Sequence, residues 1–177
     1  KKLLRCCMAK IEIIQGDITK QSVDAIVNAA NCSLLGGGGV DGAIHRAAGP
    51  ELLAECRTLG GCKTGEAKIT RGYKLPAKYV IHTPGPVWHG GNKDEADKLR
   101  SCYRNCLVLA SENGCKTVDF PSISTGVYHF PLEKASEIAI KTIAEYLFEH
   151  PEIERVRMVC FDERTKGYYE KALEKLK

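Results

Sequence analysis

The chain has 177 residues, a length that fits one globular domain. Hydrophobic residues make up 44% of it and charged residues 27%, which excludes a disordered chain, and no run of about 18 apolar residues marks a membrane span. The net charge is +4, with lysines and arginines scattered along the chain, which does not favour a nucleic-acid partner and suits a small anionic ligand.

The N-terminal segment KKLLRCCMAK contains neither a full apolar stretch nor a small-residue cleavage site, so we predict no signal peptide. The chain has nine cysteines, and none of them forms a C-x-x-C pair. Cys102 and Cys106 share a predicted helix face with Leu99, which favours core packing over a structural zinc site. Without a secretion signal, we expect reduced thiols and a cytoplasmic protein.

Hydrophobic periodicity predicts strands and helices that alternate along the chain. Isoleucines at alternate positions mark the first strand, and prolines and glycines mark where helices begin and end. In chain order we predict strands at 9–17 and 23–29, helices at 40–48 and 50–59, strands at 66–72 and 78–83, a helix at 93–114, a strand at 116–123, a helix at 131–150, a strand at 155–162 and a helix at 165–177. This order predicts an α/β sandwich in one domain, with a largely parallel sheet between helices on both faces.

Unusual loops follow four of the predicted strands. They are GDIT at 16–19, NAANCSLLGGGGVDG at 28–42, SISTGVYHF at 122–130 and FDER at 161–164. In α/β folds of this kind, ligands bind outside the carboxyl ends of the strands. We therefore expect these loops to converge on one edge of the sheet.

The four consecutive glycines, Gly36 to Gly39, lie directly before a predicted helix. Bare backbone lets a ligand approach closely, and the unpaired N–H groups at a helix start favour phosphate. A flexible surface turn is the alternative. The absence of Gly-Lys-Ser/Thr excludes a Walker A loop. A nicotinamide-cofactor site is not favoured, because the pattern Gly37-x-Gly39-x-x-Gly42 does not directly follow its strand.

The loop SISTGVYHF is a second candidate for binding phosphate. Ser122, Ser124 and Thr125 supply hydroxyls, Gly126 supplies bare backbone, and Tyr128 supplies an aromatic face. An ordinary Ser/Thr-rich loop is the alternative. Neither this loop nor the glycine loop contains Lys or Arg, so we expect backbone amides to hold a diphosphate.

Two residues at strand ends can recognise a base. The carboxylate of Asp17 can accept a hydrogen bond from an exocyclic amine such as that of adenine, or it can cap the helix start that follows. Phe161 can stack on a base, or it can pack in the core.

Polar residues around the glycine loop can hold a sugar. The amides of Asn28 and Asn31 can bind ribose hydroxyls, although one of them can instead organise the turn. Asp41 is the only carboxylate of the glycine loop. We interpret His45 as a packed or solvent-facing helix residue and Cys32 as a small buried residue.

Several segments, in this order, resemble macrodomains of the MacroD type. They are QGDIT, VDAIVNAAN, LLGGGGVDGAIHRAAGP, CKTGEA, LPAKYVIHTPGPVW, FPSISTGVYHFP and VCFDE. The resemblance covers about residues 11–176 and is strongest to the bacterial O-acetyl-ADP-ribose deacetylases. It implies a single macrodomain over residues 1–177, with a three-layer α/β/α sandwich around a mixed, largely parallel sheet.

The resemblance also implies that ADP-ribose is the ligand and which residues bind it. These are Asp17, the Ile18 backbone and Phe161 at adenine; Ser124, Thr125, Gly126, Val127 and Tyr128 around the diphosphate; Gly38, Gly39 and Val40 along the diphosphate and distal ribose; and Asn31 and Asp41 at that ribose. It implies no cofactor and no metal, because the loops show no clear match to the zinc-binding residues of some relatives.

By the same resemblance, the reaction is hydrolysis of an ester on the distal ribose. The expected partners are ADP-ribose, O-acetyl-ADP-ribose and mono-ADP-ribosylated proteins, and a module that binds ADP-ribose without turnover is the alternative. Asn31 and Tyr128 would hold the ribose and Asp41 would act on a water. A helix start stabilises the ionised carboxylate, so we expect Asp41 to position that water while a substrate phosphate oxygen shares the proton.

Overall fold

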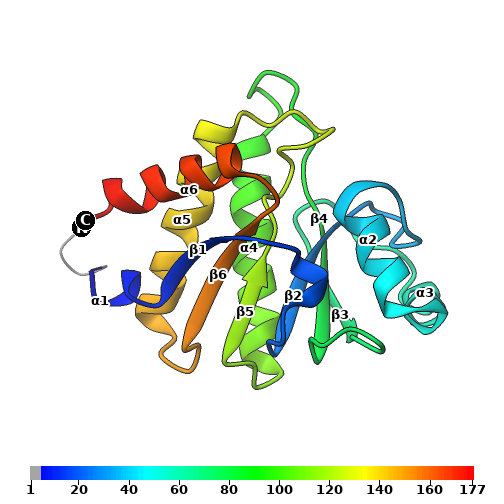
Figure 1. The fold of residues 1–177 in the computed structure, drawn as a ribbon. Helices are drawn as coiled ribbons and strands as arrows, with labels where there is room; N and C mark the ends of the chain where they lie inside the picture. Colours follow the sequence, from blue (N-terminus) through cyan, green and yellow to red (C-terminus); the bar gives the residue numbers. More distant parts are fainter. Residues whose placement is uncertain (1–4) are drawn as a thin grey trace.

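The computed structural model describes residues 5–177 and contains a six-stranded sheet with helices packed against it (Figure 1). Residues 1–4, which are part of the segment in which we predict no signal peptide, lie outside the described residues. The strands are β1 (Ile11–Gln15), β2 (Ala25–Ala30), β3 (Lys68–Arg71), β4 (Tyr79–Pro84), β5 (Thr117–Phe120) and β6 (Arg155–Cys160). The helices are α1 (Arg5–Met8), the 3-10 turn η2 (Ile18–Lys20), α2 (Gly39–Ala48), α3 (Pro50–Arg57), α4 (Glu95–Glu112), α5 (Leu132–Glu149) and α6 (Glu163–Lys175).

The sheet is mixed and largely parallel, as predicted. Its strand order is β1-β6-β5-β2-β4-β3. Neighbouring strands from β1 to β4 in this order are parallel, and only the edge strand β3 runs antiparallel to its neighbour. The five parallel strands therefore end at the same edge of the sheet.

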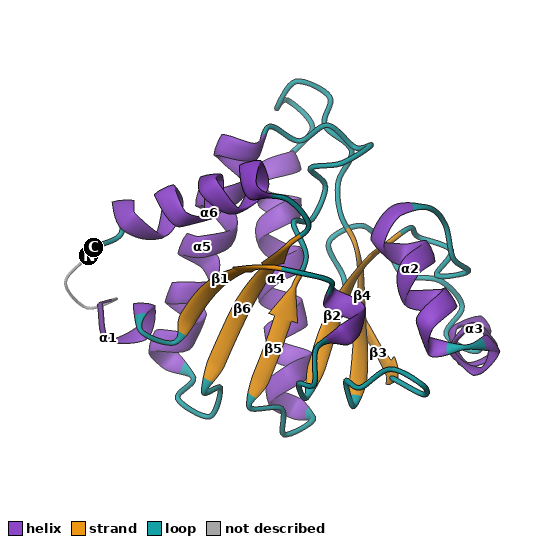
Figure 2. Cartoon of the chain, in the orientation of Figure 1, coloured by secondary structure: helices purple, strands orange, loops and turns teal. Residues whose placement is uncertain are grey.

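Two hydrophobic cores lie on opposite faces of the sheet and form the predicted three layers (Figure 2). Successive residues of β2 show the separation, because side chains alternate between faces along a strand. Ala25 and Val27 belong to the core beneath α4, α5 and α6, whereas Ile26 and Ala30 belong to the core beneath α2 and α3. Cys102 and Cys106 are buried in the first of these cores, as expected.

Every predicted element is present, and most boundaries differ by a few residues. The strand predicted at 116–123 ends at Phe120, since the following Pro121 has no N–H to donate to a neighbouring strand. The helix predicted at 50–59 ends at Arg57. The short helices α1 and η2 are not among the predicted elements, because they are too short to show a hydrophobic period.

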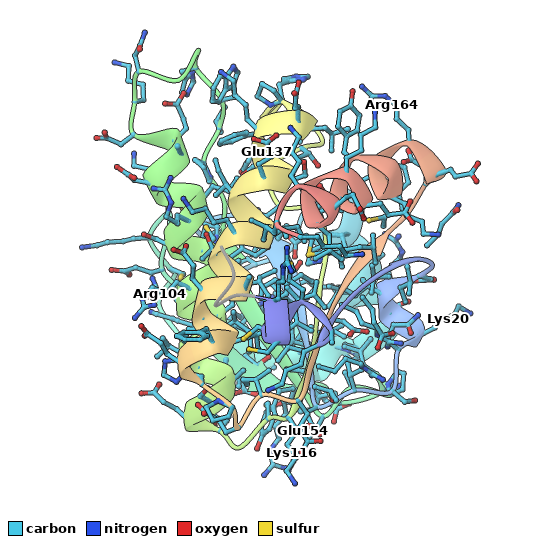
Figure 3. The ribbon with its side chains drawn as sticks, turned by 90° about the vertical axis from the view of Figure 1, so that its left-hand side faces the viewer. Lys20, Arg104, Lys116, Glu137, Glu154 and Arg164 are labelled. Carbon is cyan, nitrogen blue, oxygen red and sulfur yellow. The ribbon has the colours of Figure 1, made fainter. Side chains whose placement is uncertain are left out.

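Charged side chains project from many parts of the surface. Lys20 on η2, Arg104 on α4 and Arg164 on α6 point outward at separate places, in keeping with the scattered charge of the sequence (Figure 3). Within residues 5–177, no helix combines the length and the apolar composition that crossing a bilayer requires.

Candidate functional site

The four unusual loops meet at the carboxyl edge of the sheet. They follow β1, β2, β5 and β6, which are parallel. The Gly16 N–H donates to the Cys160 carbonyl at 2.9 Å, which joins the ends of β1 and β6. The Trp88 N–H donates to the Tyr128 carbonyl at 2.9 Å, which ties the segment after β4 to the loop after β5. The predicted convergence is therefore present in the structure.

The glycine loop leads into α2 and leaves the start of that helix without a side-chain cap. Gly38 is the N-cap residue, and an added Cβ there would meet no atom within 4 Å. Gly36 and Gly39 have φ values of 95° and 57°, a left-handed conformation that favours glycine. The open N–H groups of this helix start are suited to an anion.

Gly37 has little space for a side chain, because two polar side chains lie close to it. A Cβ at this position would lie 3.1 Å from Asp41 Oδ2 and 3.4 Å from Asn31 Nδ2. The absence of a side chain thus lets the loop pass close to one carboxylate oxygen of Asp41. It also brings Asp41 and Asn31, two of the predicted ribose-site residues, to the same point of the loop.

Asp41 lies in the first turn of α2 and is only 4% exposed. Its Oδ1 accepts a hydrogen bond from Asn28 Nδ2 at 2.9 Å and lies 3.4 Å from His45 Nε2. Because these contacts involve Oδ1, the carboxylate presents Oδ2 to the glycine loop. His45, which we interpreted as a packed or solvent-facing helix residue, is largely buried beside this carboxylate.

One of the two asparagines organises the turn, as the alternative predicts, and the other lies beneath Asp41. Asn28 is fully buried, and its Nδ2 lies within hydrogen-bond distance of both Asp41 and His82. The expectation that Asn28 could hold a sugar hydroxyl is therefore wrong. Asn31 is half-buried and organises the turn, since its Nδ2 donates to the Gly36 carbonyl at 2.8 Å.

The loop after β5 packs closely against the backbone of Gly85. Ser124 has a φ of 67°, and a Cβ on Gly85 would lie only 2.2 Å from Ser124 Oγ. Ser124 Oγ is buried and has no hydrogen-bond partner among the described residues. Gly126 and Val127 are exposed at the tip of the loop, and Val127 is 86% exposed. Their backbone is thus accessible to a ligand.

Hydroxyl groups connect the same loop to α6. Ser122 Oγ lies 2.6 Å from Thr125 Oγ1 and 2.7 Å from the Tyr169 hydroxyl, which is fully buried. The Thr125 hydroxyl also donates to the Ser122 carbonyl at 3.1 Å. Ser122 and Thr125, two of the three hydroxyl residues that we considered for phosphate binding, therefore also anchor the loop.

Asp17 caps the turn η2, as the capping alternative predicts. Its Oδ1 accepts hydrogen bonds from the Thr19 hydroxyl at 2.6 Å and from the Thr19 N–H at 2.9 Å. These hydrogen bonds, first from the hydroxyl and then from the backbone, lower the pKa of Asp17. Because both use Oδ1, Oδ2 stays available to an exocyclic amine. Ile18, the next residue, is buried.

Phe161 is 80% exposed, so the alternative that it packs in the core is wrong. It follows Cys160, whose carbonyl accepts from the Gly16 N–H, so Phe161 and Asp17 are the residues that directly follow this hydrogen bond on the adjacent strands β6 and β1. An exposed ring beside an exposed carboxylate is suited to stacking on a base while the carboxylate binds its amine.

Sequence reasoning did not identify the residues beneath Asp41. His82 is fully buried on β4 and contacts Asn28, and Thr70 on β3 contacts His82. A polar residue in the apolar strand KYVIHT was the signal available for His82. In the described part of the chain, no group of three or more His, Cys, Asp or Glu side chains has the arrangement of a metal site.

Comparisons with known proteins find similar sequences and a similar fold. The Macro domain family model matches residues 27–139. A macro domain-containing protein of Chlorobaculum tepidum is 64% identical over 163 residues, which cover 92% of this chain and 95% of the relative. A protein of Enterobacter cloacae named O-acetyl-ADP-ribose deacetylase is 56% identical over 168 residues, covering 93% of each chain.

Solved structures show the same fold. The Oceanobacillus iheyensis macrodomain with ADP has a TM-score of 0.90 and 46% identity, covering 94% of this chain and 90% of its own. The Trypanosoma brucei macrodomain in complex with ADP-ribose has a TM-score of 0.88 and 48% identity, covering 93% of this chain and 69% of its own.

Proposed function

This chain belongs to the macro domain family, and from that premise we propose that it binds ADP-ribose and hydrolyses esters on the distal ribose. The adenine lies between Asp17 and Phe161. The diphosphate lies on the backbone amides of the glycine loop and of residues 124–128, and the distal ribose reaches Asn31 and Asp41. The relatives named O-acetyl-ADP-ribose deacetylase support the acetyl ester as the substrate.

The observation that carries this proposal is the orientation of Asp41. A carboxylate that only capped a helix start would accept hydrogen bonds from the backbone N–H groups of the first helical turn. Here Oδ1 is bonded to the buried Asn28, and Oδ2 lies against the glycine loop beside Asn31. One oxygen is fixed and the other faces the place where the ribose would lie, which is an arrangement suited to holding a water.

The chemistry follows from that position. Asp41 Oδ2 orients a water toward the acyl carbon of the ester, and Asn31 and Tyr128 hold the ribose. Addition of the water forms a bond to the acyl carbon, and the bond between that carbon and the ribose oxygen then breaks. The ribose oxygen takes one proton of the water, which a phosphate oxygen of the substrate helps to transfer, and the acetic acid that leaves releases the other proton to solvent and becomes acetate.

The same site would act on ADP-ribose esterified to Asp or Glu side chains of proteins. The bond that breaks is the same, and only the leaving carboxylate is larger. The glycines from Gly37 to Gly39 are exposed, which leaves space for a polypeptide beside the distal ribose. Turnover on the free acetyl ester, compared with turnover on a glutamate-modified protein, measures which substrate is preferred.

Acetate release from O-acetyl-ADP-ribose tests the proposal. Asp41→Asn should slow turnover by roughly 10²- to 10⁴-fold, as expected for loss of a group that assists the attacking water, while ADP-ribose still binds in calorimetry. Asp97→Asn, the same change at an exposed residue of α4, is the control. If the wild-type protein binds ADP-ribose and releases no acetate, the protein is a binding module. An Asp41→Asn variant as fast as the wild type would contradict the role of Asp41.

A further inference from the structure

A chain of buried polar side chains lies beneath Asp41 and crosses three neighbouring strands. Asn28 on β2 and His82 on β4 are direct partners in the sheet register, and Thr70 lies on the next strand, β3. Asn28 and His82 are fully buried, and Thr70 is 2% exposed. Asn28 Nδ2 lies 2.9 Å from Asp41 Oδ1 and 3.1 Å from His82 Nδ1. His82 Nε2 lies 2.9 Å from Thr70 Oγ1.

Only one assignment of protons satisfies these contacts. A carboxylate only accepts hydrogen bonds, so the amino group of Asn28 must face Asp41. The same amino group faces His82 Nδ1, which must therefore be unprotonated and accept. The ring proton is then on Nε2 and is donated to Thr70 Oγ1, whose own proton goes to the Arg71 carbonyl at 3.1 Å.

The reverse orientation of Asn28 is unfavourable beside Asp41. It would place the amide oxygen against the Asp41 carboxylate, and it would move the His82 ring proton to Nδ1. In the observed orientation, Asn28 Oδ1 is buried without a partner among the described residues. An unsatisfied buried oxygen is costly, so the orientation must be held by the two bonds of the amino group.

His82 is suited to holding that orientation because it stays neutral. Burial, with a smaller contribution from the nearby His45, lowers the pKa of His82 to about 3. A protonated ring would carry a proton on Nδ1 and could not accept from Asn28.

We propose that His82 and Thr70 are positioning residues for the reaction described above. Thr70 keeps the ring proton on Nε2, His82 then accepts from Asn28, and Asn28 holds Asp41 Oδ1 so that Oδ2 faces the glycine loop. The inference rests on the proposed hydrolysis, and it assigns a role in that reaction to residues that do not contact the substrate.

Kinetics of Thr70 variants test the proposal. Thr70→Val removes the oxygen that accepts from His82 Nε2 and leaves that nitrogen only the longer contact with Cys56 Sγ at 3.8 Å. It should lower kcat by roughly 10- to 100-fold, the scale expected when a reacting group is misplaced. KM and the Kd for ADP-ribose should change much less than kcat, because the backbone amides proposed to hold the diphosphate do not contact this network. Thr70→Ser keeps the acceptor and should restore kcat.

The matched control is Thr142→Val, which removes a buried hydroxyl on α5 whose bond goes to the Ile138 carbonyl at 2.7 Å. It should leave kcat unchanged. A Thr70→Val variant with the kcat of the wild type, or one that Thr70→Ser does not rescue, would overturn the positioning role. Thermal unfolding of each variant shows whether a loss of kcat reflects a loss of fold.

The tautomer of His82 provides a measurement that needs no turnover. In ¹⁵N-labelled wild-type protein, NMR should show His82 with Nδ1 unprotonated and Nε2 protonated, and His82→Asn identifies its signals among the five histidines. A proton on Nδ1 would overturn the inference. A wild-type protein that releases no acetate would overturn the proposed hydrolysis instead, and the tautomer would still decide whether Asn28 is held toward Asp41.

Discussion

At the scale of single residues, the exposed ring of Phe161 makes the clearest prediction. Stacking of a base on an aromatic side chain contributes about 1–3 kcal/mol. Phe161→Ala should therefore weaken ADP-ribose binding by roughly 5- to 150-fold in calorimetry, with little change in the thermal unfolding midpoint. Phe148→Ala, at a second exposed phenylalanine at the end of α5, is the control and should bind normally. Normal affinity in Phe161→Ala would exclude the stacking role.

Asp17 allows its two roles to be separated by one substitution. Asparagine caps a helix start about as well as aspartate, so Asp17→Asn can keep the bonds from Thr19 through its amide oxygen. Its amino group would then replace Oδ2 and repel the adenine amine. We expect wild-type stability in urea unfolding together with roughly 5- to 150-fold weaker ADP-ribose binding, since a buried or bound donor left unpaired costs about 1–3 kcal/mol. Unchanged affinity would leave Asp17 as a cap alone.

At the scale of elements, the loop after β5 depends on a glycine of a different loop. A Cβ on Gly85 would lie 2.2 Å from Ser124 Oγ and 2.6 Å from Ile123 Cγ2, so the loop must move. Gly85→Ala should cost about 1–3 kcal/mol of folding free energy through overpacking and should also weaken ADP-ribose binding.

The control for Gly85 is a glycine with open space around it. Gly167 lies in α6, and an added Cβ there meets no atom within 4 Å. Gly167→Ala should raise the free energy of unfolding by up to about 1 kcal/mol, because alanine favours the helix. Urea unfolding and calorimetry measure both variants, and a Gly85→Ala protein that matches the wild type in both would contradict this account of the loop.

The elements were predictable where the hydrophobic period is long, and less so elsewhere. The long helices α4 and α5 and the buried strands repeat their pattern often enough to be recognised. The turn η2 has three residues and shows no period, although the capping residue Asp17 indicated a helix start. The sequence could not decide between an exposed and a buried Phe161 side chain, because the exposure of a residue at a strand end depends on which other elements pack around it.

At the scale of the whole molecule, the site combines predictable and unpredictable parts. The order of strands and helices places the glycine loop and the loop after β5 on one edge, and glycine patterns indicate the bare backbone. The network of Asn28, His82 and Thr70 depends on the register between β2, β4 and β3. Residues 28, 70 and 82 become neighbours only through that register, which local patterns do not determine.

A buried carboxylate supports the remaining loop of this edge. Glu95, the first residue of α4, is 1% exposed. It accepts backbone hydrogen bonds from His89 at 2.7 Å, Gly91 at 3.0 Å and Lys93 at 2.6 Å. The neighbouring Trp88 is bonded to the Tyr128 carbonyl, so Glu95 fixes a segment on which the candidate site rests.

This arrangement predicts how the whole protein responds to acid. Burial alone would raise the pKa of Glu95, but the backbone donors outweigh it and lower the pKa to about 2 from an ordinary value of 4.5. Because the pKa is lower in the folded state, the stabilisation is complete above about pH 4.5 and is lost as the pH falls toward 2. Urea unfolding from pH 7 to pH 2.5 should show Glu95→Gln less stable than the wild type near neutrality and less sensitive to pH below 4.5. Glu154→Gln, at an exposed residue, should keep the wild-type pH dependence. An equal loss of stability with acid in Glu95→Gln and in the wild type would mean that the titration of other carboxylates controls the acid response of this protein.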